Sequence, residues 1–151
     1  MPGYALQQGE GRTYDWRGHL FTIKAAAADT GGRLAFWEFT TKKGDEPNDH
    51  THDDVDEIFY VLEGSLTVRC GDEQFEVSDH GFVFLPRNVQ HGYTIHSDGP
   101  VRLLGLSAPS DFGDHIERTG KRLAEPEATA MRDALLRATR GRGRGPRSAP
   151  D

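Results

Sequence analysis

The sequence predicts an all-β fold, a barrel or a roll of two packed sheets, with short helices at its C-terminal end. Between residues 12 and 106 it alternates short runs of β-branched and aromatic residues with turns that contain glycine. No helical pattern separates these runs, whereas folds with a parallel sheet place a helix between successive strands. Ala, Leu and Met recur at helical spacing only near the C-terminal end.

The individual elements follow from local composition. Strands are expected at residues 12–16, 19–25, 34–40, 57–62, 66–70, 74–77, 82–85, 93–95 and 101–106. Helices are expected at 111–119 and 125–139, and Pro126 suits the first turn of the second helix. Residues 26–28 are alanines, but Asp29-Thr30-Gly31-Gly32 follows at once, so we expect a loop there.

The chain divides into four segments. They are an N-terminal arm at residues 1–11, a barrel at 12–120, a C-terminal helix at 121–139 and an Arg/Gly-rich tail at 140–151. The tail has no apolar face to bury, so we expect it to be disordered. Within the barrel, the strand at 34–40 has large side chains on both faces, which suits a core on one side and a second layer or subunit on the other.

Composition excludes several classes of partner. Residues 137–151 contribute +4 through five Arg and one Asp, so residues 1–136 carry −10 of the formal net charge of −6. An acidic surface argues against nucleic acid as a partner, because phosphate binding depends on a basic face. Cys70 is the only cysteine, and no apolar N-terminal segment suggests a signal peptide or a membrane span. We therefore expect a cytoplasmic protein.

Two histidines and a glutamate stand at metal-ligand spacing. His50 and His52 are two residues apart, so on an extended strand both imidazoles point to the same side. The polar run at residues 53–56 offers a turn, after which Glu57 opens a new strand. We expect this strand to lie next to the one that carries the histidines.

His91 is the fourth candidate ligand, placed after a short apolar run and Pro86. Three neutral imidazoles and one carboxylate suit one divalent transition metal ion, Fe, Mn, Ni, Co or Zn, and suit Ca or Mg badly. The alternative is that the four residues are buried, hydrogen-bonded polar groups in a barrel without a metal. Removing three imidazoles and a carboxylate from water without an ion is costly, which favours the metal site.

The spacing of these residues and of the glycines that flank them resembles the first sequence motif of the cupin family: Gly44-x5-His50-x-His52-x4-Glu57-x6-Gly64. The second cupin motif is similar to residues 81–91, with Pro86 and His91 in place. Asn88 stands where that motif has a glycine, and Ile95 stands where members often have an asparagine. Asparagine is the residue that best replaces glycine in a left-handed turn.

The resemblance extends over roughly residues 10 to 120. It implies a cupin jelly-roll barrel with His50, His52, Glu57 and His91 as metal ligands inside it, and a homodimer in which N-terminal arms pair with the partner. Residues 29–39 and 108–112 are similar to single-domain members of the quercetin 2,3-dioxygenase-like group.

The same alternation predicts the wall of a substrate pocket. Phe59 and Val61 follow Glu57 on its own face, and Tyr93 and Ile95 follow His91. Trp37 and Phe39 complete the expected pocket. Such a wall, apolar with one phenol, suits an aromatic or polyketide-like small molecule better than a free sugar.

Three functions are compatible with this site. The first is a metal-dependent dioxygenase that uses dioxygen, in which the catalytic residue Glu57 takes the proton of a substrate hydroxyl. The second is a redox-neutral cyclase or isomerase of a natural-product pathway. The third is a binding module for small molecules without turnover.

Overall fold

The computed structural model describes residues 2–140, and within them the chain forms ten strands and three helices. The strands are β1 (Arg12–Trp16), β2 (His19–Ala25), β3 (Ala35–Thr41), β4 (Asp56–Glu63), β5 (Leu66–Cys70), β6 (Glu73–Val77), β7 (Phe82–Leu85), β8 (His91–Ile95), β9 (Val101–Ala108) and β10 (Lys121–Arg122). The helices are α1 (Ala27–Thr30), α2 (Asp111–Thr119) and α3 (Glu125–Arg140). Every strand expected from composition is present, and the all-β prediction with C-terminal helices is confirmed.

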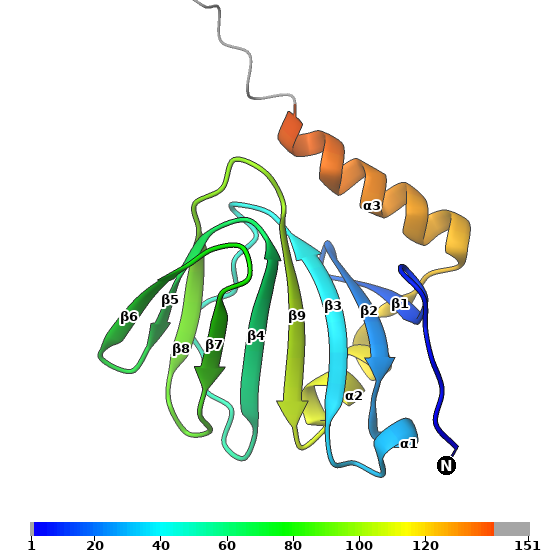
Figure 1. Cartoon of the computed structure of the whole chain (residues 1–151), viewed down its shortest axis with the longest axis horizontal. Helices are drawn as coiled ribbons and strands as arrows, with labels where there is room; N and C mark the ends of the chain where they lie inside the picture. Colours follow the sequence, from blue (N-terminus) through cyan, green and yellow to red (C-terminus); the bar gives the residue numbers. More distant parts are fainter. Residues whose placement is uncertain (1, 141–151) are drawn as a thin grey trace, which may run out of the picture.

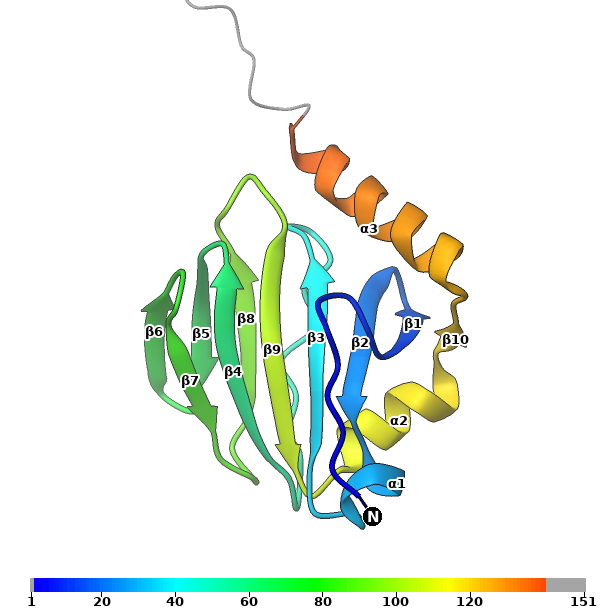
Figure 2. The ribbon, with the colours of Figure 1, turned by 45° about the vertical axis from the view of Figure 1, so that its right-hand side comes forward.

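Two antiparallel sheets enclose the core. The larger has the strand order β10-β1-β2-β3-β9-β4-β7 and the smaller has the order β6-β5-β8. Figure 1 shows the larger sheet as a curved wall, and Figure 2 shows β8 behind β4 and β9. Aromatic contacts join the two sheets, since the rings of Phe59 on β4 and Tyr93 on β8 lie 6.3 Å apart.

The core of the larger sheet follows from strict alternation. On β4 and β9 every second residue is buried, and on β3 Ala35 points inward together with Trp37 and Phe39, the two residues expected in the pocket. Trp37 lies opposite Gly105, and the missing side chain at Gly105 makes room for the indole ring.

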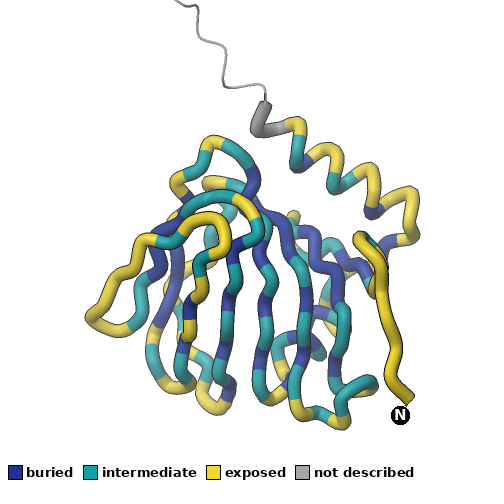
Figure 3. Tube along the Cα trace, in the orientation of Figure 1, coloured by how far each residue is buried: buried dark blue, intermediate teal, exposed yellow. Residues whose placement is uncertain are grey.

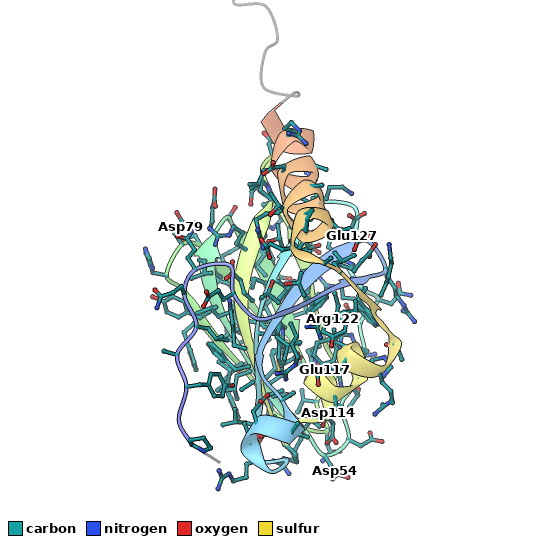
Figure 4. The ribbon with its side chains drawn as sticks, turned by 90° about the vertical axis from the view of Figure 1, so that its right-hand side faces the viewer. Asp54, Asp79, Asp114, Glu117, Arg122 and Glu127 are labelled. Atoms are coloured by element: carbon teal, nitrogen blue, oxygen red, sulfur yellow. The ribbon has the colours of Figure 1, made fainter. Side chains whose placement is uncertain are left out.

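Helix α2 is held against the start of the chain by charged side chains. Arg12 pairs with Asp29 at 2.7 Å and also with Glu117 of α2. The carboxylate of Asp114 accepts a hydrogen bond of 3.0 Å from the backbone N–H of Ala27. Figure 4 shows Asp114 and Glu117 between α1 and Arg122.

The prediction of a loop at residues 26–28 is wrong, because α1 forms one helical turn there. The Asp29 carboxylate accepts a hydrogen bond of 2.9 Å from the N–H of Ala26 and so caps the turn. Gly31 then ends the helix with a φ of 66°. The interrupting residues therefore cap and terminate a helix at this position instead of preventing one.

The expected position of the Glu57 strand is also wrong. Strand β4 lies between β9 and β7 in the larger sheet. His50 instead forms an isolated bridge with His91 of β8, on the opposite side of the core. The histidines and Glu57 thus approach the site from opposite sheets.

The ends of the chain pack on the outside of the barrel. Leu123, Ala128 and Leu135 form a small apolar cluster with Leu20 of β2, which holds α3. The N-terminal arm runs outside β2, where the hydroxyl of Tyr4 donates to the Lys24 carbonyl at 2.6 Å (Figure 2). Residues 141–151, most of the tail that was expected to be disordered, lie outside the described residues. No helix in residues 2–140 has the length and apolar character needed to cross a membrane.

Gly105→Ala tests the packing of Trp37. A Cβ at this position would lie 2.3 Å from atoms of the indole ring, so the ring must move in a filled core. Overpacking of this kind costs about 1 to 3 kcal/mol, which corresponds to a melting temperature lower by roughly 5 °C in a chain of this size. Calorimetry measures the shift.

Gly99→Ala is the matched control, because a Cβ at residue 99 would meet nothing within 4 Å and no left-handed φ is involved. Equal melting temperatures for the two variants would contradict the packing described for Trp37.

Candidate metal centre

Four side chains converge between the two sheets. His50 forms a β-bridge with His91, the first residue of β8, and His52 lies in the loop that follows His50. Glu57 is the second residue of β4. One ligand atom from each residue lies within 4.8 Å of the others. The structure therefore brings together all four residues singled out from the sequence.

The centre of this group is buried and incompletely hydrogen-bonded. Glu57 and His91 are each 3% exposed. The Oε2 atom of Glu57 lies 3.6 Å from Nε2 of His52 and 3.5 Å from Nε2 of His91, which is too far for normal hydrogen bonds. Both Nε2 atoms are buried without a hydrogen-bond partner. A cation between these atoms would satisfy them, so the donor set fits a divalent transition metal.

Backbone carbonyls orient two of the imidazoles. Nδ1 of His50 lies 2.9 Å from the carbonyl oxygen of Asn48, and Nδ1 of His91 lies 3.0 Å from that of Val89. An N–H at Nδ1 donates to the carbonyl and leaves the lone pair on Nε2, which is the arrangement of histidines that ligate metals.

The electrostatics keep Glu57 ionised. Burial alone would raise the pKa of the Glu57 carboxyl, but the neighbouring imidazoles of His52 and His91 outweigh it and hold the pKa below its usual value. Glu57 in turn raises the pKa of His52 against the opposing effect of burial. The Glu57 carboxylate is therefore available as an anionic ligand.

A small apolar cavity of about 90 Å³ adjoins the group and is lined in part by His50, Glu57 and His91. Most of its other lining residues are aromatic: Trp16, Phe21, Trp37, Phe39, Phe59, Tyr93 and Phe112. A wider, open vestibule of about 860 Å³ lies outside it. The two spaces adjoin, because both are lined by Trp16, His19, Pro47, His50 and Phe112.

Comparison with known proteins identifies the family. Residues 37–107 match the family model described as "Cupin domain". The chain is 30% identical over 117 residues to quercetin 2,3-dioxygenase of Bacillus subtilis (strain 168), which covers 78% of this chain and 34% of that protein. The chain belongs to the cupin family. It spans about a third of the length of that curated relative, so the similarity alone does not establish the same activity.

Solved structures support the same fold. KdgF from a Halomonas species superposes with a TM-score of 0.62 at 21% identity, covering 72% of this chain and 94% of that one. A predicted oxalate decarboxylase from Thermotoga maritima superposes with a TM-score of 0.61 at 13% identity, covering 70% and 99%. At these identities the similarity establishes the cupin fold alone.

The turn after Pro86 holds the ligand-bearing loop of this cupin in place. Asn88, which replaces the glycine of the cupin motif, adopts a φ of 63°, as expected for this substitution. Its N–H donates to the His52 carbonyl at 2.8 Å. Arg87 pairs with Asp56 at 2.7 Å. The turn is therefore bonded to both ends of the loop between His52 and Asp56.

Acidic residues around the histidines act as further clamps. Asp49 pairs with Arg69 of β5 at 2.5 Å. This pair crosses so close to Gly92 that a Cβ there would lie 2.0 Å from the Asp49 carboxylate. Glu46 accepts a hydrogen bond of 2.9 Å from the N–H of Ile95, the residue that replaces the asparagine of many cupins. These contacts give Asp49 and Glu46 structural roles.

The expected pocket residues separate into two groups. Trp37, Phe39, Phe59 and Tyr93 line the cavity. Val61 and Ile95 have no exposed surface and lie in the core outside the lining.

Nothing local in the sequence selects Trp16, Phe21 or Phe112 for the wall. They come from β1, β2 and α2, whose distance from the ligands depends on pairing between distant segments.

Replacing single ligands tests the metal centre. His50→Ala or His91→Ala should lower metal affinity by at least about 100-fold, since even changes to residues that only orient ligands cost roughly 10- to 100-fold. Elemental analysis after reconstitution with Mn, Fe, Co, Ni or Zn measures the metal content of each variant. His96→Ala is the control, because His96 is a histidine outside the group. A full equivalent of metal in both ligand variants would rule out this centre.

Proposed function

We propose that this cupin is a metal-dependent dioxygenase that acts on an aromatic or polyketide-like enol or diketone. The observation that carries the proposal is the aromatic wall of a cavity that is also lined by His50, His91 and the buried carboxylate of Glu57, three of the four converging residues. The similarity to quercetin 2,3-dioxygenase over a third of that enzyme's length gives additional support.

His50, His52, Glu57 and His91 would hold the metal. A bound divalent ion would supply Lewis acidity toward a substrate oxygen and, when redox-active, a means of activating dioxygen. The proposed task of Glu57 is to accept the proton of the substrate hydroxyl at its Oε2 atom, which faces His52 and His91. The aromatic wall would orient the flat body of the substrate and exclude water from the reacting end.

Oxygen uptake on a panel of flavonols and diketones tests the proposal. Uptake that requires a redox-active ion and stops with Zn would support the dioxygenase. Turnover that continues with Zn and without oxygen uptake would instead support a redox-neutral cyclase or isomerase. Binding of the panel without any turnover would point to a binding cupin.

Glu57→Gln separates the role of base from that of ligand. Three histidines alone hold divalent ions in proteins, so the variant should keep most of its metal. The amide cannot accept a proton, and general-base assistance is worth a factor of roughly 100 to 10,000 in rate. Turnover per bound metal ion should therefore fall by that factor.

Glu63→Gln makes the same chemical change on the same strand at an exposed position, and it should behave as wild type. A turnover per metal ion near wild type in Glu57→Gln would end the base hypothesis.

We also propose a homodimer that forms through the outer face of the larger sheet. On this face Phe84, Ile58, Leu106 and Phe36 lie side by side across β7, β4, β9 and β3. Phe84 is 50% exposed and Phe82, on the same edge strand, is 60% exposed. Figure 3 shows the exposed stretches along β7.

The charges beside this apolar row support a second copy as the occupant. Arg102 pairs with Glu38 and lies 3.7 Å from Glu63, and Arg87 pairs with Asp56. The described part of this face therefore presents no unpaired cation that would call for an acidic partner. Elsewhere the acidic surface repels a copy of itself.

Phe82→Ser combined with Phe84→Ser should weaken the dimer by roughly 100-fold or more, because each Phe contributes about 1.5 to 3 kcal/mol when fully buried. Sedimentation equilibrium measures the dissociation constant. Phe75→Ser on β6 is the control, since Phe75 is also exposed, at 40%, but belongs to the smaller sheet. A monomeric wild-type protein, or equal effects in both variants, would refute this interface.

A further inference from the structure

The inner cavity is too small for a whole aromatic substrate. Its volume is about 90 Å³, whereas an engineered apolar cavity that binds benzene measures about 150 Å³. Any ligand with more than one ring that reaches the four-residue centre must therefore extend into the vestibule. The side chains of the vestibule then determine which chemical group a bound ligand can have at its outer end.

One wall of the vestibule presents Arg17 above Trp16. Arg17 and Gly18 form the turn between β1 and β2, with φ angles of 54° and 85°. The Arg17 guanidinium lies 4.7 Å from the centre of the Trp16 ring, a cation–π contact that holds it over a residue lining both spaces. Trp16 is itself fixed to α2, because its indole N–H donates to the Thr119 hydroxyl at 3.0 Å.

Helix α2 adds His115 and Arg118 to the same wall. The imidazole of His115 lies 5.9 Å from the ring of Trp16, and both residues line the vestibule. Arg118 also lines it. Within residues 2–140, neither Arg17 nor Arg118 has a carboxylate within ion-pair distance.

Two of the three carboxylates in the described lining of the vestibule are held by groups other than Arg17 and Arg118. Asp45 pairs with Lys42. Glu46 accepts hydrogen bonds from the backbone N–H groups of Gly44 and Ile95. Asp111, exposed at the start of α2, is the remaining carboxylate of the described lining and is set against two arginines. Arg17 and Arg118 therefore have no carboxylate at ion-pair distance within residues 2–140, so their guanidinium groups can bind an anion.

We propose that the vestibule binds an anionic group at the outer end of the substrate through Arg17 and Arg118. The substrate would then be an aromatic or polyketide-like acid, with its hydroxyl end in the apolar cavity and a carboxylate facing the two guanidinium groups. Arginine suits this role because its planar donors match a carboxylate. This inference rests on the proposed function, since it assumes that the apolar cavity receives the reacting end.

Calorimetric titration of the metal-loaded protein with two probes tests it. The probes are 6-hydroxy-2-naphthoate, whose hydroxyl and carboxylate lie at opposite ends, and 2-naphthol, which lacks the carboxylate. The wild type should bind the acid more tightly than the neutral probe. Arg17→Gln combined with Arg118→Gln should lower the affinity for the acid by roughly tenfold, as expected for the loss of two solvent-accessible ion pairs. The affinity for 2-naphthol should stay unchanged.

Arg33→Gln combined with Arg137→Gln is the matched control. It changes the net charge equally, but neither residue lines the vestibule, so acid binding should stay at the wild-type level. Equal losses in the two double variants, or an acid that binds no more tightly than 2-naphthol, would overturn the anion site and leave the proposed function intact. Failure of both probes to bind would overturn both.

Discussion

The carboxylate of Glu57 is buried between the imidazoles of His52 and His91, and this arrangement constrains the rest of the structure. An isolated buried carboxylate is strongly destabilising, so it must have positively charged or hydrogen-bonding neighbours. Here Oε2 lies about 3.5 Å from two buried nitrogen atoms that have no other partner. A divalent ion resolves both problems together, because it balances the charge and accepts the free lone pairs.

Much of the surrounding structure serves to hold the four side chains at that point. The four residues come from opposite sheets, so strand pairing within one sheet does not fix their relative positions. Arg87 and Asp56 fasten the turn after β7 to the start of β4, while Arg69 and Asp49 fasten the histidine loop to β5. In this way the acids near the histidines stabilise the loops and leave Glu57 as the carboxylate among the four converging residues.

The sequence predicted features that depend on neighbouring residues, such as the candidate ligands and the inward face of a strand. It predicted poorly the features that depend on pairing between distant segments. The spacing of His50, His52 and Glu57 predicted which residues form the group, because it matches the first cupin motif. Alternation along β3 and β4 likewise predicted which side chains point inward. The sheet to which each strand belongs depends on long-range register, so the partner of His50 was placed incorrectly. The same limit hid Trp16 and Phe112, which reach the cavity from segments far along the chain.

The central claim is that three imidazoles and the Glu57 carboxylate bind one divalent metal ion. X-ray absorption spectroscopy of the reconstituted protein tests it most directly, because it reports the atoms bound to the metal. The expected result is a first shell that contains three imidazole nitrogens and a carboxylate oxygen, with one imidazole lost in His91→Ala. A shell made only of oxygen atoms, or one that His91→Ala leaves unchanged, would contradict the assignment.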